Sequence, residues 1–210
     1  MKKTILALVV LLSIFGLYTC GTKDLAPRDQ RTVKLDPEFD KVAWAVIPEQ
    51  IDGDKWTVTF KSEIDDGWSV YSTNSYGDMG PWPSSFHFDT LAHVLPTDST
   101  MEESVHTIEG HDPVFDMLVK KFKHQVDFKR DVRLLLSDIP FTGRFEYMTC
   151  NDETCLPPAT VYYEAHPDSG TFRLSPVPFD LSGYMVVSCA DGVYKLPGVD
   201  LKSPLININM

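Results

Sequence analysis

Short segments in which apolar and polar residues alternate recur along the chain, and they constrain its fold more than any other feature. They lie at residues 56–60, 68–71, 86–88, 126–128, 132–134, 143–148 and 161–163. Alternation places the apolar side chains on one face of a half-buried strand. Turn-forming residues separate the segments, and we expect one short helical turn at most, at residues 115–122. This pattern predicts an all-β fold, built as an antiparallel β-sandwich.

The length and the charge of the chain narrow its class. The chain has 210 residues, 43% of them hydrophobic, which is enough to build an ordinary domain around a full core. Its formal net charge is −11. Nucleic acids attract basic surfaces, so we do not expect this acidic chain to bind DNA or RNA.

The first residues have the form of an export signal. Lys2 and Lys3 precede an almost wholly apolar stretch at residues 5–17, which is shorter than a comfortable membrane span. The next run, Leu-Tyr-Thr-Cys-Gly, is similar to a lipoprotein cleavage box. We therefore expect a lipoprotein signal peptide over residues 1–19, a lipid on Cys20, and a periplasmic or cell-envelope location on a membrane. An ordinary signal peptide, or an uncleaved anchor with an incidental Cys20, is the alternative.

Two further segments flank the predicted domain. Residues 20–32 are expected to tether the lipid to the fold. Residues 167–210 are rich in proline and form a C-terminal extension, in which residues 184–189 and 193–196 flank an Ala-Asp-Gly turn and predict a hairpin. The role of this extension stays open. Cys189 within it can be a buried inert thiol, a reactive thiol or a partner in intermolecular pairing.

Cys150 and Cys155 are separated by four polar residues that favour a turn. Outside the cytosol, disulfides can form and persist. Strands that enter and leave this turn would set the two cysteines opposite each other, with Cα atoms about 4.5–5.5 Å apart, which suits a disulfide. A bond that closes so short a loop stabilises the fold by roughly 2 kcal/mol. The spacing therefore fits a redox-active pair and also fits a local structural disulfide.

Three motifs resemble the N-terminal periplasmic domain of the DsbD family of thiol:disulfide interchange proteins. The first is the cysteine pair followed by Leu-Pro-Pro at residues 156–158. The second is the segment 64–71, which is similar to the family's Asp-Gly-aromatic-x-aliphatic-Tyr strand. The third is the segment 110–116, which stands where the family has a cap loop over its cysteines. The resemblance spans residues 33–166, the predicted domain.

This resemblance implies an immunoglobulin-like β-sandwich that passes reducing equivalents to other proteins. It implies that Cys155 forms the mixed disulfide with a partner and that Cys150 resolves it. The residues implied around the pair are Phe115, as the cap, and Tyr71, Asp112 and Trp68. The nearby Asp152 and Glu153 would disfavour a thiolate, so selectivity is expected to come from docking of a partner that already carries a reactive thiol.

The resemblance also implies the partners of the chain. These are thioredoxin-like domains, a membrane electron-transfer protein that is a separate chain, and exported clients that contain disulfides. Disulfide isomerases and cytochrome c maturation factors are examples of such clients. No cofactor is expected.

Two other functions remain open from the residues. The cysteine pair could join His106 and His111 in a zinc site, although we expect no metal. The chain could instead be a non-catalytic module that binds protein or glycan, with a structural hairpin disulfide. The aromatic residues available for a glycan-binding face are Trp68, Tyr71, Tyr76, Trp82 and Phe86. Aromatic residues at strand spacing also build cores, and a binding module would tolerate serine at both cysteines.

Overall fold

The computed structural model describes residues 31–89, 91, 93–97, 100–104, 108–181, 184–189 and 192–197. The predicted signal peptide, Cys20, His106 and most of the predicted tether lie outside these residues. Every element in the described ranges is a strand, and neighbouring strands pair antiparallel. The predicted all-β class and immunoglobulin-like sandwich are confirmed.

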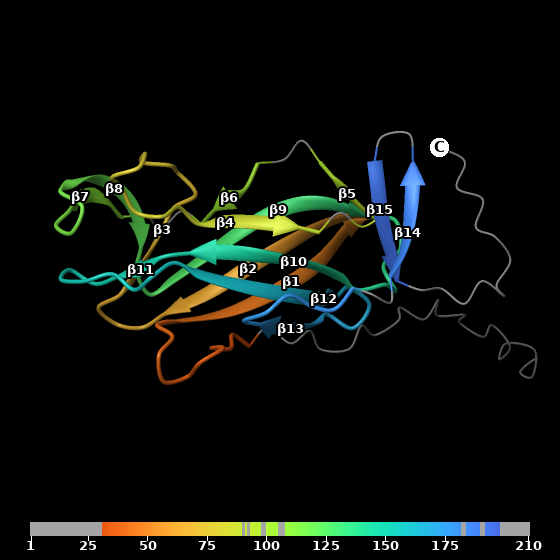
Figure 1. Cartoon of the computed structure of the whole chain (residues 1–210), viewed down its shortest axis with the longest axis horizontal. Helices are drawn as coiled ribbons and strands as arrows, with labels where there is room; N and C mark the ends of the chain where they lie inside the picture. The colour runs from red at the N-terminus through yellow and green to blue at the C-terminus, as the bar shows by residue number, and fades with distance from the viewer. Residues whose placement is uncertain are drawn as a thin grey trace, which may run out of the picture.

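Two larger sheets form the body of the molecule (Figure 1). The first sheet runs in the order β1 (Val42–Asp52), β2 (Lys55–Ile64), β9 (Gln125–Leu134) and β5 (Val94–Pro96), and β6 (Glu102–Glu103) also pairs with β9. The second sheet runs in the order β13 (Thr171–Ser175), β12 (Ala159–His166), β10 (Phe141–Tyr147) and β4 (Ser85–Phe88). Sheets that pack face to face through their apolar faces make a sandwich.

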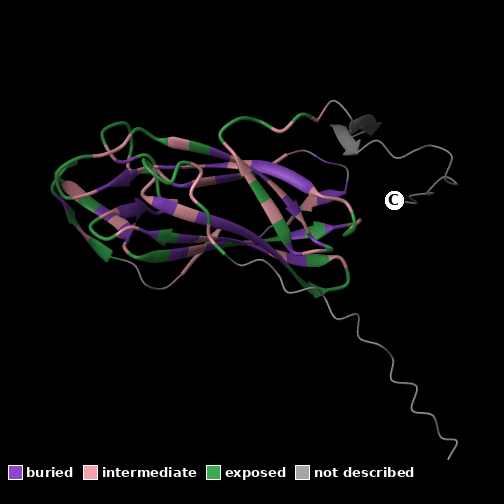
Figure 2. Cartoon of the chain, turned by 90° about the horizontal axis from the view of Figure 1, so that it is seen from below, coloured by how far each residue is buried: buried purple, intermediate pink, exposed green. Residues whose placement is uncertain are grey.

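Aromatic side chains from both sheets meet in the core. Trp44 of β1 lies 4.8 Å from Phe145 of β10 between ring centroids, and Phe60 of β2 lies 4.6 Å from Phe86 of β4. These contacts cross from one sheet to the other, and they arise because alternate residues of each strand face inward. Figure 2 shows buried segments running along the strands of the sandwich, while exposed residues gather in the loops and at the strand ends.

A third, smaller sheet extends one end of the sandwich. It runs in the order β11 (Thr149–Cys150), β3 (Ser69–Tyr71), β8 (Met117–Phe122) and β7 (Ile108–Asp112). β11 follows β10 almost directly along the chain, so the second sheet leads into the small one. Figure 1 places this sheet at the end of the molecule opposite to the hairpin of β14 (Tyr184–Cys189) and β15 (Gly192–Pro197).

The expectation of a helical turn at residues 115–122 is wrong. Residues 117–122 form strand β8, which pairs with β3 on one side and with β7 on the other. Two strand partners satisfy the backbone groups of β8, and such tertiary pairing overrides a weak local preference for helix. Asp116, just before β8, adopts a positive φ of 52° in the turn from β7.

The sandwich continues past residue 166, where the sequence resemblance ends. β13 pairs with β12, and Phe172 and Leu174 of β13 pack against the main core. The hairpin predicted near residues 184–196 is confirmed, because β14 and β15 pair with Cys189 opposite Gly192. In the part of the chain described here, no helix is long and apolar enough to cross a membrane.

Candidate functional site

The small sheet presents different side chains to two separate clusters. Val70 of β3 is buried in the main core, while its neighbour Tyr71 is buried in a second cluster together with Val119 and Cys150. This division follows from the pleat, since successive side chains of a strand point to opposite faces. The second cluster, which we call the cysteine cluster, also contains partly buried side chains, those of Tyr76, Phe115, Met117, Met148 and Cys155.

A tight turn brings Cys150 and Cys155 together. The side-chain oxygen of Asn151 accepts hydrogen bonds from the backbone N–H groups of Glu153 (2.9 Å) and Thr154 (2.7 Å), and the N–H of Asn151 donates to the carbonyl of Thr154 (2.9 Å). Asparagine favours such turns because its short side chain can imitate a backbone acceptor. The two cysteines form an antiparallel bridge, as predicted, and are joined by a disulfide. Their Cα atoms lie 4.0 Å apart, which is closer than the expected separation.

The two cysteines differ in exposure. Cys150 is 1% exposed and belongs to strand β11, which is paired with β3. Cys155 is partly exposed and follows the turn. A reactant from solution therefore meets Cys155 first. Attack on Cys155 would release Cys150 as the leaving thiol, because a nucleophile that bonds to one sulfur of a disulfide displaces the other.

Phe115 packs against this cluster from the loop between β7 and β8. Its ring meets the ring of Tyr71 edge to face, with centroids 5.8 Å apart and planes at 87°. The loop is held by Asp112, whose Oδ1 accepts hydrogen bonds from the N–H groups of Val114 (3.0 Å) and Phe115 (3.3 Å). The carbonyl of Asp112 also accepts a hydrogen bond from the N–H of Asp116 (2.9 Å).

The carboxylate of Asp112 is buried and bound on its other oxygen. Oδ2 accepts a hydrogen bond from the hydroxyl of Tyr71 (2.9 Å) and one from Nζ of Lys121 (2.7 Å). Burial alone would raise the pKa of Asp112, but the hydrogen bonds from Lys121, Tyr71 and the Val114 N–H outweigh it and leave the pKa below its usual value. Burial, helped by the hydrogen bond to Asp112 and its charge, raises the pKa of Tyr71. The site thus holds a charged carboxylate beside a neutral phenol.

Of the four residues that the resemblance implied around the cysteine pair, three lie near the cysteines. Tyr71 and Phe115 belong to the cysteine cluster, and Asp112 binds Tyr71. Trp68 instead packs against the main core, with Nζ of Lys41 5.8 Å from its ring centroid.

Sequence reasoning placed neither Lys121 nor Tyr76 near the cysteines, and it considered Tyr76 only for a glycan-binding face. Lys121 did leave a signal in the sequence. It continues the every-second-residue pattern of Met117 and Val119, so it faces the same cluster, and a charged side chain buried there needs a partner. Tyr76 left none, because it stands in an irregular loop.

The aromatic residues considered for a glycan-binding face do not form one. Phe86 is 6% exposed in the main core, and Tyr71 is fully buried. Of the five aromatic residues, Trp82 is the most exposed, at 48%. Residues that point into two different clusters cannot stack together on one sugar.

Of the two histidines considered for a zinc site, His111 has another contact and His106 lies outside the described residues. Nε2 of His111 lies 2.8 Å from Oδ1 of Asp116, and both side chains are largely exposed. Among the described residues, no group of three or more His, Cys, Asp and Glu side chains is placed to hold a metal ion.

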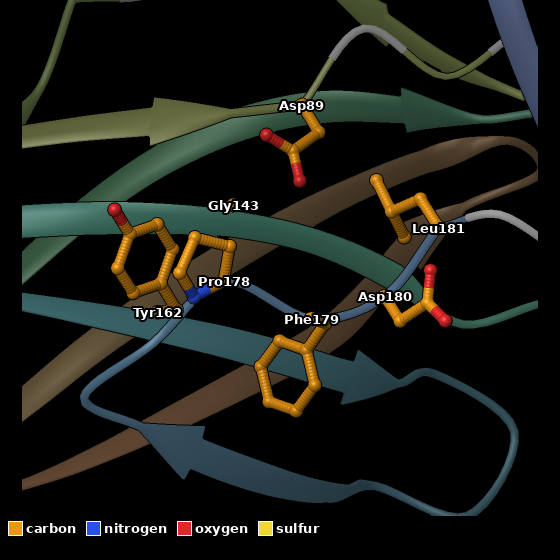
Figure 3. A pocket seen from close by; sticks show the side chains of 7 residues that line it. All are labelled: Asp89, Gly143, Tyr162, Pro178, Phe179, Asp180 and Leu181. Carbon is orange, nitrogen blue, oxygen red and sulfur yellow. The ribbon is translucent and has the colours of Figure 1, made fainter.

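A separate pocket of about 410 Å³ lies on the second sheet (Figure 3). Its lining residues are Asp89, Gly143, Tyr162, Pro178, Phe179, Asp180 and Leu181. Cys150 follows Gly143 by seven positions along the chain, which corresponds to roughly 23 Å of extended backbone. The Asp89 carboxylate is engaged by the hydroxyl of Thr142 at 2.6 Å. The pocket is thus distinct from the cysteine cluster.

Comparison with known proteins finds a solved structure with a similar fold. No protein-family model and no curated protein matches the chain. Among solved structures, the chain is similar to the reduced N-terminal domain of DsbD from Neisseria meningitidis, with 16% sequence identity and a TM-score of 0.42. The match covers 62% of this chain and 90% of that domain.

Proposed function

We propose that this chain is an exported thiol–disulfide exchange domain that relays reducing equivalents through Cys150 and Cys155. One observation supports this proposal above the rest. The pair is a disulfide with one buried and one partly exposed cysteine, set in an apolar cluster that also contains Phe115. A disulfide that served only as a staple would need neither this asymmetry nor an apolar setting.

The exchange proceeds in two steps. In the reduced protein, the thiolate of Cys155 attacks one sulfur of a client disulfide, a bond forms between Cys155 and the client, and the second client sulfur leaves as a thiolate and takes up a proton. The thiolate of Cys150 then attacks the sulfur of Cys155 and releases the client as a dithiol. The client gains two electrons and two protons, and the protein is left with the Cys150–Cys155 disulfide.

A dithiol donor must then reverse these steps on the protein. We propose a thioredoxin-like domain in this role, supplied with electrons by a membrane protein. The N-terminal sequence supports a periplasmic or cell-envelope location with a lipid on Cys20. A location outside the cytosol suits the proposed clients, because disulfides persist there.

A redox titration of the purified protein tests the proposal, with the state of each cysteine read by mass spectrometry. We expect Cys150 and Cys155 to form one reversible pair at a potential of about −200 to −270 mV, the range of glutaredoxins and thioredoxin. A pair that stays oxidised below about −300 mV would be a structural disulfide and would overturn the proposal. The binding-module function would then be the better explanation.

Trapping is the companion experiment. The Cys150→Ser variant lacks the resolving thiol, so it should accumulate a mixed disulfide between Cys155 and a client. The Cys155→Ser variant is the matched control, because its remaining thiol is buried and should capture little.

A further inference from the structure

Tyr76 belongs to the cysteine cluster although it comes from neither the cysteine hairpin nor the loop that carries Phe115. It lies on the long loop between β3 and β4, residues 72–84, and its side chain is partly buried against the cysteine cluster. Figure 1 shows this loop above the small sheet, next to the β7–β8 hairpin. Two separate loops therefore each contribute an aromatic side chain to the cysteine cluster.

The hydroxyl of Tyr76 takes the place of a strand partner. At the end of β3, the N–H of Ser72 donates to the carbonyl of Lys120 (3.0 Å), which continues the pairing with β8. The bond in the other direction, from the N–H of Lys120 to the carbonyl of Ser72, is not made. That carbonyl instead accepts a hydrogen bond from the N–H of Ser84 (3.0 Å). The N–H of Lys120 donates to the Tyr76 hydroxyl at 2.6 Å. This bond fastens the middle of the loop to the strand that carries Val119.

Both ends of the loop are fixed. The Glu103 carboxylate accepts hydrogen bonds from the N–H (2.6 Å) and the hydroxyl (2.9 Å) of Thr73, and it pairs with Nζ of Lys120 at 2.6 Å. At the other end, the hydroxyl of Ser84 donates to the carbonyl of Tyr71 at 2.6 Å. A loop with fixed ends can open only in its middle, where the Tyr76 hydroxyl is bound.

The middle of the loop is packed closely against Tyr76. A side chain at Gly80 would collide with Cβ of Tyr76 and would lie 3.2 Å from Sδ of Met117, another member of the cysteine cluster. Neighbouring Met79 and Trp82 point outward, at 83% and 48% exposure. The loop thus packs Tyr76 against the cysteine cluster and leaves Met79 and Trp82 exposed to solvent.

We propose that Tyr76 is a second cover of the disulfide and a specificity-determining residue that slows attack by small thiols. This proposal rests on the proposed function and adds to it. Phe115 covers the pair from the β7–β8 loop, and Tyr76 covers it from the β3–β4 loop. A productive partner must displace both rings, which a docking protein surface does more readily than a small thiol.

The test measures reduction of the full-length oxidised protein by dithiothreitol. One thiolate of dithiothreitol attacks the sulfur of Cys155, the Cys150–Cys155 bond breaks, and Cys150 leaves as a thiolate. The second thiol of dithiothreitol then closes its own ring, and Cys155 is released reduced. We expect Tyr76→Ala to raise the second-order rate about fivefold, and Tyr76→Phe to raise it about twofold, because the phenylalanine keeps the ring and loses the hydrogen bond.

Met79→Ala is the matched control, since Met79 is on the same loop and faces solvent; its rate should equal that of the wild type. The reduction potential should be the same in all variants, because a cover changes access and not the equilibrium between thiols and disulfide. If Tyr76→Ala does not fold, Tyr76→Phe decides the test by its own rate.

Wild-type rates in both Tyr76 variants would overturn this inference and leave the relay intact, provided that the wild-type pair is reversible. A wild-type pair that resists reduction at every potential would overturn the proposed function itself, whatever the variants do. A shift in potential that accounts for the whole rate change would mean that Tyr76 stabilises the disulfide and does not shield it.

Discussion

The carboxylate of Asp112 joins three parts of the site. It binds the backbone of the Phe115 loop, the hydroxyl of Tyr71 on β3, and the ammonium group of Lys121 on β8. Asp112 is 1% exposed, and the side chain of Lys121 is 10% exposed. Removing one member of a buried ion pair leaves the other charge without compensation, which costs more than the pair contributes.

We predict that Asp112→Asn lowers the free energy of unfolding by about 3 kcal/mol at neutral pH. The folded-state pKa of Asp112 is depressed, so its contribution is present above the unfolded value of about 3.9 and is lost as the pH falls through the folded pKa. The gap between the stabilities of wild type and variant should therefore narrow as the pH falls below about 4. Urea unfolding across this range measures the gap, and the exposed Glu63→Gln change is the control. A gap that stays constant would contradict the prediction.

Phe115 and its neighbour Val114 offer a matched pair of substitutions. Phe115 is partly buried against Tyr71, whereas Val114 is 38% exposed on the same loop. We predict that Phe115→Ala speeds the reaction of the pair with small thiols and oxidants several-fold, and that Val114→Ala does not. Stopped-flow oxidation of the reduced protein measures both rates. Unchanged rates in Phe115→Ala would remove Phe115 from the role of a cap.

At the scale of elements, β10 lies between β12 and β4 and leads into the cysteine hairpin. Gly143 in this strand meets its neighbours closely, since a Cβ there would collide with the carbonyl of His87 and the hydroxyl of Tyr163. The Tyr163 hydroxyl itself donates to the His87 carbonyl at 3.1 Å. The sheet therefore needs a residue without a side chain at this position.

We predict that Gly143→Ala destabilises the protein by about 3 kcal/mol, because two backbone or ring groups would have to move within a packed sheet. Gly110→Ala in β7 is the control, because a Cβ there meets nothing within 4 Å. Chemical denaturation of the two variants gives the comparison. Equal stabilities would mean that β4 can shift away from β10 without loss of packing.

At the scale of the whole molecule, the sandwich and the cysteine site are separate packing units. The main core contains Trp44, Phe60 and Phe128, while Cys150 belongs to the cysteine cluster at one end. The disulfide joins residues only five positions apart, so it restricts the unfolded chain very little. Opening and closing of the pair can therefore proceed while the sandwich stays folded.

We predict that the double variant Cys150→Ala, Cys155→Ala keeps the fold and loses about 2 kcal/mol of stability. Circular dichroism and urea unfolding report on the fold, and transfer of electrons to a client should vanish. A variant that fails to fold would show that the disulfide is a staple of the sandwich.

The sequence by itself determined the all-β class, several of the strands and the place of the cysteine pair, although it did not predict β1. These depend on local chemistry, since alternation selects strands and Asn151 begins a turn through hydrogen bonds to residues two and three positions ahead. The same local view failed at residues 117–122, where pairing with β3 and β7 made a strand. The β12–β13 pairing that carries the sandwich past residue 166 is likewise a tertiary contact.

Only the tertiary structure decided which side chains surround the disulfide. Tyr71, Phe115 and Tyr76 meet because β11, β3 and β8 pair in one register, and a shift by one residue would turn Tyr71 to the other face. Lys121 reaches Asp112 for the same reason. Trp68, which the sequence set beside the pair, went to the main core. Register and sheet order join residues far apart in the chain, and a local pattern carries no information about such partners.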